Sequence, residues 1–149
     1  MPRSPNLFLF PDTNVWIALS LEVHIHHSVA RQWLSSLPLA SRLGFCRVTQ
    51  MSFLRLLTTE AVMGREGVLT QADAWRAYDR VLENDSVSFL PEPAGIDDEF
   101  RSLSSNNHSA PKEWTDAYLA AFASASGVTL VSFDQGFRGK VRNLLLLST

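Results

Sequence analysis

Three aspartates, Asp12, Asp116 and Asp134, occupy positions from which their carboxylates could act together. Asp12 follows the apolar stretch 6–10, and Asp134 follows the apolar stretch 128–133. Asp116 lies near the start of segment 111–126, whose apolar residues have helical spacing. Each aspartate has an ordinary structural explanation: Asp12 could cap a helix, Asp134 could serve a turn, and Asp116 could favour the positive end of a helix. Taken singly, none of the three indicates a function.

The segments that would position these aspartates alternate between strands and helices. The expected strands are 6–10, 43–48, 86–93, 128–133 and 143–147, and the expected helices are 13–20, 28–37, 49–59, 70–82, 96–105 and 111–126. Pro11 should end the first strand, and Ser28, Thr49 and Thr70 are predicted helix caps. The alternation predicts an α/β fold in three layers, α/β/α, with a mostly parallel central sheet of four to five strands. We expect one domain over residues 1–149, with no internal repeat or long linker.

A parallel sheet would bring the three aspartates to one edge. Strands in such a fold run one way and the connecting helices run back, so that strand ends and helix starts share the edge where ligands bind. Clustered carboxylates repel one another unless protons or cations neutralise them. A hard cation such as Mg²⁺ or Mn²⁺, held by a few carboxylates and several waters, relieves this repulsion. The three aspartates together therefore predict metal-assisted phosphodiester hydrolysis.

The same residues carry a resemblance to a known family. The segments are FPDTNVWIAL (10–19), VTQMSFLRLLT (48–58), EWTDAYLAAFASASGVTLVSFDQGF (113–137) and an apolar final strand. In order and spacing they resemble the PIN-domain ribonucleases, specifically the VapC-type toxins of bacterial toxin–antitoxin (VapBC) pairs. The resemblance implies a PIN-like fold in which Asp12, Asp116 and Asp134 bind Mg²⁺ or Mn²⁺ and support endonucleolytic cleavage of RNA. It also implies that Thr13, Asn14 and Ser132 support these carboxylates.

One position departs from the family pattern. VapC-type proteins usually carry a Glu on the helix after the second strand, about three residues before an Arg. Alignment on Arg55 places Ser52 there, and a hydroxyl can hold a metal-bound water but contributes no charge. The site could therefore bind its second metal weakly or use only one metal. Glu113, three residues before Asp116, is a possible compensating acid.

Basic residues near the expected site are candidates for contacts with RNA. The net charge of −2 argues against a generally basic nucleic-acid-coating protein. Of the 13 basic residues 11 are Arg, which suits bidentate phosphate contacts. The predicted phosphate-binding residues are Arg55, Arg138, Lys140 and Arg142, although each could equally be an ordinary surface charge.

Other features favour structural explanations. The segment HIHH, with His24, His26 and His27, lacks the partners of a zinc site and is expected to be a polar loop. Trp33, Trp75 and Trp114 occupy apolar helical stripes and are expected in the core, whereas Trp16 is less certain. The segment SSNNHSAP (104–111), which contains His108, is expected to be a loop.

Composition and resemblance together give expectations for compartment and partners. No apolar run approaches the length of a membrane span. Because Cys46 is alone, no intrachain disulfide can form, and a reducing, cytoplasmic location is expected. The resemblance implies a homodimer, a small VapB-type antitoxin that covers the site, and a structured RNA substrate such as tRNA or rRNA.

Two other functions are compatible with parts of the sequence. An aspartyl phosphatase would need a second Asp two residues after the first, and Asn14 occupies that position. A catalytically impaired PIN module that binds RNA or regulates a partner would account for the missing Glu. The leading hypothesis is a metal-dependent endoribonuclease toxin.

Overall fold

The computed structural model describes residues 7–148 and contains five strands and seven α-helices over that range. The strands are β1 (Phe8–Pro11), β2 (Arg42–Phe45), β3 (Val87–Phe89), β4 (Thr129–Ser132) and β5 (Leu144–Leu146). The helices are α1 (Thr13–Ser20), α2 (His27–Ser36), α3 (Arg47–Leu57), α4 (Glu60–Met63), α5 (Gln71–Leu82), α6 (Ile96–Leu103) and α7 (Trp114–Ser126), with a 3₁₀ turn η1 (Gln135–Phe137).

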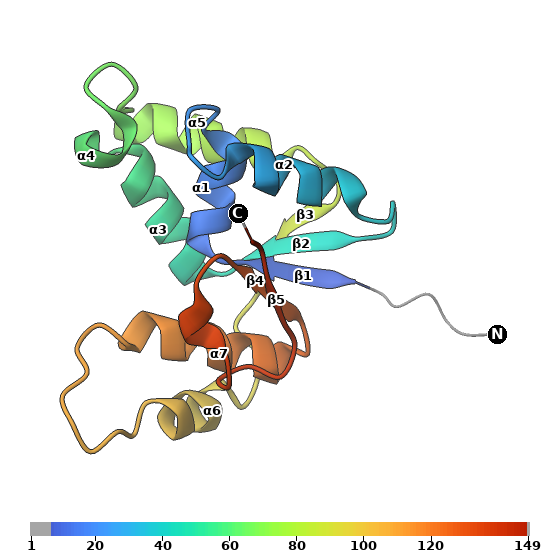
Figure 1. Ribbon diagram of the computed structural model, residues 1–149, viewed down its shortest axis with the longest axis vertical. Helices are drawn as coiled ribbons and strands as arrows, with labels where there is room; N and C mark the ends of the chain where they lie inside the picture. The colour runs from blue at the N-terminus through green and yellow to red at the C-terminus, as the bar shows by residue number, and fades with distance from the viewer. Residues whose placement is uncertain (1–6, 149) are drawn as a thin grey trace.

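All neighbouring strands in the sheet are parallel, in the order β3-β2-β1-β4-β5. Figure 1 shows α1, α2, α3 and α5 on one side of this sheet and α6 and α7 on the other. The predicted three-layer α/β/α fold with a mostly parallel sheet is confirmed. The strand order makes β1 and β4 direct neighbours, with Pro11 opposite Val131. Asp12 and Asp134 therefore follow adjacent strands.

Two apolar cores lie on the two faces of the sheet, because successive strand residues point to opposite faces. Leu9 of β1 and Val131 of β4 belong to the core beneath α1, α3 and α5. Phe10 and Leu130, their immediate neighbours in sequence, belong to the core beneath α6 and α7. The Phe10 ring stacks on Phe122 of α7 with centroids 4.8 Å apart. Both faces of the central strands are thus buried, which explains why these strands read as continuous apolar runs.

Of the three predicted helix caps, Ser28, Thr49 and Thr70, one is confirmed. The Thr70 hydroxyl accepts a hydrogen bond from the Asp73 N–H (3.1 Å), so its prediction as the cap of α5 is confirmed. Ser28 is not a cap, since α2 begins one residue earlier at His27. Thr49 is also not the cap of α3: Cys46 occupies that position, and the Thr49 hydroxyl accepts a bond from the Cys46 N–H (2.9 Å). Thr49 therefore closes the other half of a capping box.

The expectation that the tryptophans lie in the core is only partly correct. Trp16 is buried and stacks on Phe45 with centroids 4.0 Å apart, and Trp33 packs partly buried against the same core. Trp75 and Trp114, by contrast, are 48% and 54% exposed. The prediction is wrong for these two because helical spacing places a residue on the apolar side of its helix without showing how far the neighbouring element covers that side. Over residues 7–148 no helix is long and apolar enough to cross a membrane.

Candidate active site

Asp12 and Asp134 are joined through a buried hydroxyl between adjacent strands. The Ser132 side chain at the end of β4 is fully buried, and its Oγ donates to Asp12 Oδ2 (2.9 Å). The same oxygen accepts a hydrogen bond from the backbone N–H of Asp134 (2.9 Å). Asp12 is held a second time by the Thr13 N–H, which donates to its Oδ1 (2.7 Å). Asp12 is therefore the N-cap of α1, and its carboxylate is at the same time held in place by Ser132.

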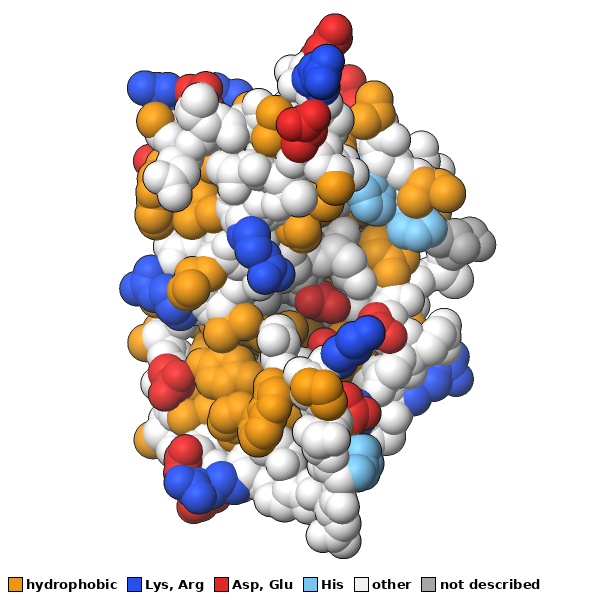
Figure 2. All heavy atoms as spheres, turned by 90° about the vertical axis from the view of Figure 1, so that its left-hand side faces the viewer, with side chains coloured by type: hydrophobic (Ala, Val, Ile, Leu, Met, Phe, Trp, Pro, Cys, Tyr) orange, Lys and Arg blue, Asp and Glu red, His pale blue; other side chains and the backbone are white. Residues whose placement is uncertain are grey.

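Asp116 approaches the same place from the other helical layer. It lies in the first turn of α7, half-buried, and its charge acts on Asp12. Burial raises the pKa of the Asp12 carboxyl, and the charges of Asp116 and Asp134 raise it further, against the hydrogen bonds from Ser132 and Thr13. Figure 2 faces the edge at which the strands end and shows acidic and basic side chains around a hollow near its middle. The three predicted aspartates therefore lie at one edge and repel one another.

A lysine lies beside this acidic cluster. Burial raises the pKa of the Asp116 carboxyl and the charge of Asp134 adds to this, whereas the charge of Lys140 opposes both. The Lys140 Nζ lies 3.9 Å from Glu113 Oε1, and Glu113 is the residue that precedes α7. Glu113 in turn acts on Asp116 by charge. Lys140 and Glu113 thus belong to the electrostatic surroundings of the aspartates, and Asp116 is the carboxylate on which both act.

Of the predicted supporting residues, Asn14 and Ser132 are in contact. The Asn14 Nδ2 lies 3.4 Å from Ser132 Oγ, and its Oδ1 is a buried oxygen for which the described residues offer no hydrogen-bond donor. Ser52 lies on α3 beside Val48 and Met51, on a shallow apolar hollow. Within residues 7–148 no hydrogen bond joins Ser52 to the three aspartates. The role predicted for Ser52 stays a prediction.

The four predicted RNA-binding cations are dispersed. Lys140 adjoins the acidic cluster, and Arg138 ends η1 only four residues after Asp134. Arg55 is exposed about two helical turns into α3. Arg142 lies with Gly127 and Val128 in a hollow at the other edge of the sheet, where β4 and β5 begin. One RNA segment at the aspartates could reach Lys140 and Arg138 more readily than Arg142.

Two groups of side chains near the site were expected to be plain loop residues. The segment around His24 is a loop, as predicted, but the His26 ring stacks on Phe133, between Ser132 and Asp134, with centroids 4.6 Å apart. His108 and Asn106 lie in the predicted loop before α7, and both approach Glu113 Oε2 (3.9 and 3.4 Å). No sequence signal distinguished these residues from solvent-exposed loop, because the contacts join positions whose pairing depends on the fold.

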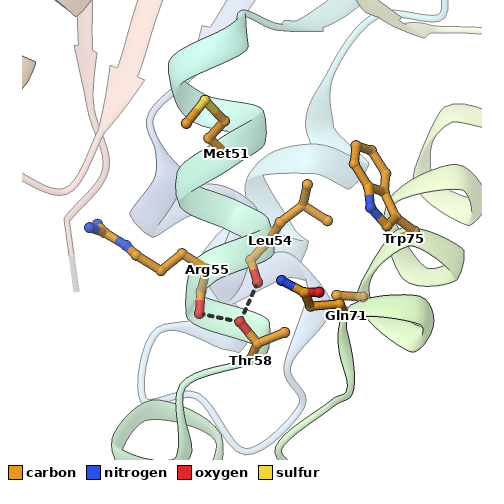
Figure 3. Close-up of a pocket in the computed structure, with 7 residues that line it drawn as sticks. Met51, Leu54, Arg55, Thr58, Gln71 and Trp75 are labelled. Atoms are coloured by element: carbon orange, nitrogen blue, oxygen red, sulfur yellow. Dashed lines mark hydrogen bonds between the residues drawn. The ribbon is translucent and has the colours of Figure 1, made fainter.

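A second hollow lies between α3 and α5. Met51, Leu54 and Arg55 of α3 line it together with Trp75 of α5. Figure 3 shows Leu54 and Trp75 on opposite sides of this hollow, whereas the Arg55 side chain extends away from Trp75. Met51 is 60% exposed, so an apolar surface is open to a partner on this side of the molecule.

The chemistry of the three aspartates fits a hard divalent cation. Over residues 7–148 no three His, Cys, Asp or Glu side chains converge closely enough to surround an ion. Mg²⁺, however, is commonly bound through one or two carboxylates with water completing its shell. The carboxylates at this edge are oxygen ligands, the pKa values of Asp12 and Asp116 are raised, and a cation would relieve the repulsion that contributes to these shifts. The assignment of Asp12, Asp116 and Asp134 as ligands of such an ion stays a prediction.

Comparison with known proteins adds independent information. Residues 9–142 match the family model described as PIN domain. Ribonuclease VapC41 of Mycobacterium tuberculosis (strain CDC 1551 / Oshkosh) is 43% identical over 132 residues, which cover 87% of this chain and 90% of the relative.

Two solved structures share the fold. One is VapBC2 from Rickettsia felis bound to a promoter DNA fragment, with a TM-score of 0.64, 14% identity, and coverage of 94% of this chain and 97% of that chain. The other is VapC20 of Mycobacterium tuberculosis, described as a sarcin–ricin loop cleaving toxin, with a TM-score of 0.58, 16% identity, and coverage of 87% and 91%.

Proposed function

This chain belongs to the PIN-domain family, with a VapC ribonuclease as a close relative, and from this premise we propose that it is a metal-dependent endoribonuclease toxin. The observation that carries the proposal is the meeting of the three aspartates at the carboxyl edge of the sheet, where Ser132 bonds both Asp12 and the backbone of Asp134, and where the charges of Asp116 and Asp134 act on Asp12. Burial and neighbouring carboxylates raise the pKa values of Asp12 and Asp116, which is a costly arrangement for structure alone and a useful one for cation binding. We propose that the 149 residues act as one catalytic domain.

The residues of this chain would share the work as follows. Asp12, Asp116 and Asp134 are the proposed catalytic residues and would hold Mg²⁺ or Mn²⁺. The cation, when bound, supplies charge stabilisation at a phosphoryl oxygen and activation of water. Ser132 orients Asp12 and fixes the backbone at Asp134 through its two hydrogen bonds, while Thr13 and Asn14 complete the support. Lys140, whose charge acts on Asp116, would contact an RNA phosphate there.

The substrate and partners follow from the family. We propose that the chain cleaves a structured RNA such as tRNA or rRNA in the cytoplasm, forms a homodimer, and is neutralised by a VapB-type antitoxin. The structural neighbours include complexes of toxin and antitoxin, among them one from Klebsiella pneumoniae. The apolar hollow between α3 and α5, with Met51 and Trp75 exposed, supports binding of a protein partner.

Cleavage of structured RNA tests the proposed activity. We expect the purified chain to cut a panel of tRNA and rRNA fragments with Mn²⁺ or Mg²⁺, and Asp116→Asn or chelation to abolish the cuts. Asp116→Asn keeps the shape of the side chain and removes the charge on which cation binding depends. Sequencing of RNA ends would map each cut, and Asp79→Asn, at an exposed position on α5, is the matched control.

The outcome also decides between the two functions left by the sequence. Identical RNA patterns for the wild type and Asp116→Asn across the panel would exclude the nuclease. Retained RNA binding under those conditions would instead support an impaired PIN module, in which Ser52, at the position where the family usually has a Glu, accounts for the lost catalysis. Cleavage that depends on Asp116 would exclude that alternative.

A further inference from the structure

An exposed tryptophan stands beside the acidic cluster. Trp114 is the first residue of α7, follows Glu113 and precedes Asp116 by two positions. Its side chain is 54% exposed, more than any other Trp in the described chain. Trp side chains, which combine a large apolar ring with a polar N–H, are enriched where proteins bind a partner. The position of Trp114 at the edge that carries the aspartates indicates that the partner belongs to the same site.

The Trp114 ring packs against an aromatic ring of α6. The Phe100 ring of α6 meets it edge to face, with centroids 6.1 Å apart and planes at 74°. Phe100 is fixed in turn against Tyr118 of α7, with centroids 5.6 Å apart. These contacts restrict the indole while leaving more than half of its surface open. A restricted and open aromatic ring is suited to stacking with a flat ligand.

Trp114 is also one wall of a hollow that contains hydrogen-bonding groups. Asn106, His108 and Glu113 line this hollow together with Trp114. The amide, the imidazole and the carboxylate supply both donors and acceptors, and the Glu113 carboxylate can accept more than the one hydrogen bond that it receives from Asn106. An aromatic wall with polar groups beside it is the surrounding in which proteins bind an unpaired base.

Glu113 links the hollow to the acidic cluster. Glu113 lines the hollow, lies 3.9 Å from Lys140, and acts by charge on Asp116. Lys140 partly neutralises Glu113, which reduces the repulsion that a phosphate backbone would meet on this path. A nucleotide whose base occupied the hollow would therefore have its phosphate near Lys140 and the aspartates.

We propose that Trp114 is a base-stacking residue, and that the hollow beside it binds an unpaired nucleotide of the RNA next to the cleaved bond. This inference rests on the proposed ribonuclease function and deepens it by naming the feature of RNA that is recognised. Duplex RNA cannot place a base in the hollow, because its bases are stacked and paired. The protein should therefore prefer loops and bulges to helical segments.

Binding in the presence of EDTA tests the proposal without any cleavage. The probes are a labelled RNA hairpin with a single-stranded loop and a blunt duplex with the same stem, measured by fluorescence anisotropy. Trp114→Ala should weaken binding of the hairpin by about tenfold, in the range found for loss of one stacked base, and should leave the duplex unchanged. Trp114→Phe should restore most of the hairpin affinity. Trp75→Ala is the matched control, because Trp75 is exposed to a similar extent on α5.

A second substitution guards against misfolding. Trp114→Leu keeps apolar bulk against Phe100 but removes the ring, and it should lose hairpin affinity as Trp114→Ala does. Wild-type affinity in either variant, equal losses on hairpin and duplex, or an equal loss in Trp75→Ala would overturn the proposal. The result is independent of the cleavage assay. If Trp114→Ala selectively loses hairpin affinity but the wild type cleaves no RNA, the stacking site is retained and the nuclease is rejected. If the wild type cleaves RNA but Trp114→Ala keeps its hairpin affinity, only the stacking site is rejected.

Discussion

At the scale of single residues, the Ser132 hydroxyl is the group that connects the parts of the site. It donates to Asp12, accepts from the backbone of Asp134, and lies within reach of Asn14. A buried hydroxyl that serves several groups fixes their relative positions, because leaving any of them unbonded carries a desolvation cost. The Asp12 carboxylate is thereby oriented by a neutral group, and its charge remains available for a cation.

The raised pKa of Asp116 predicts a dependence of stability on pH. Burial and the charge of Asp134 raise the pKa of Asp116 above its ordinary value of 3.8. The folded state therefore binds this proton more tightly than the unfolded chain, and the stabilisation is lost as the pH rises through the folded-state pKa. In metal-free buffer with EDTA, Asp116→Asn should melt at a higher temperature than the wild type at pH 7.

The difference in melting temperature between Asp116→Asn and the wild type should depend on pH. The advantage of Asp116→Asn should shrink as the pH falls toward 3.8, where the wild-type carboxyl becomes protonated. Calorimetric melting at several pH values would measure this, with Asp85→Asn as the control at an exposed position before β3. A constant difference between Asp116→Asn and the wild type across this pH range would contradict the assignment of the effect to ionisation of Asp116.

At the scale of elements, the start of α3 depends on a buried capping box. Thr49 is fully buried, accepts from the Cys46 N–H (2.9 Å) and donates to the Cys46 carbonyl (3.1 Å). Helix starts leave backbone N–H groups without intrahelical partners, and here the side chain rather than water must satisfy one of them. Because α3 begins directly after β2, this cap also sets the direction in which Ser52 and Arg55 are presented.

Thr49→Val should therefore destabilise the fold by about 1–3 kcal/mol, the cost of a buried donor without a partner. Valine keeps the shape of threonine, so packing changes little. Urea denaturation would measure the loss, and Thr59→Val is the control because the Arg55 carbonyl that Thr59 bonds also accepts from Thr58. A loss in Thr49→Val no larger than in Thr59→Val would show that the box does not stabilise α3.

At the scale of the whole molecule, the sheet order brings three distant segments to one edge. Asp12 follows β1, Asp134 follows β4, and Asp116 lies on the helix that leads into β4. β1 and β4 are adjacent in the sheet, so a cation held by these residues would tie together the first and last parts of the fold. A ligand that binds only the folded state stabilises the whole domain.

Mn²⁺ should accordingly raise the melting temperature. At about one hundred times the dissociation constant the expected gain is ~2.7 kcal/mol, which for a domain of this size is roughly 5–10 °C. Asp134→Asn should lose most of this shift, since it removes one of the three charges, whereas Asp79→Asn should retain it. Differential scanning calorimetry in matched metal concentrations is the measurement. An undiminished shift in Asp134→Asn would place the cation elsewhere.

The sequence by itself determined the α/β class, the alternation of elements and the carboxyl-edge positions of the aspartates, because these follow from local periodicity and from the direction of parallel strands. It also determined the cap of α5, a contact between residues three apart. Only the tertiary structure decided which strands are neighbours, and hence that Ser132 meets Asp12 across 120 positions. The tertiary structure also decided that Lys140 lies near the aspartates whereas Arg142 lies at the far edge of the sheet. It decided as well that Trp114 is exposed and Trp16 is buried. Periodicity specifies which side of a helix is apolar, and packing decides how much of that side another element covers.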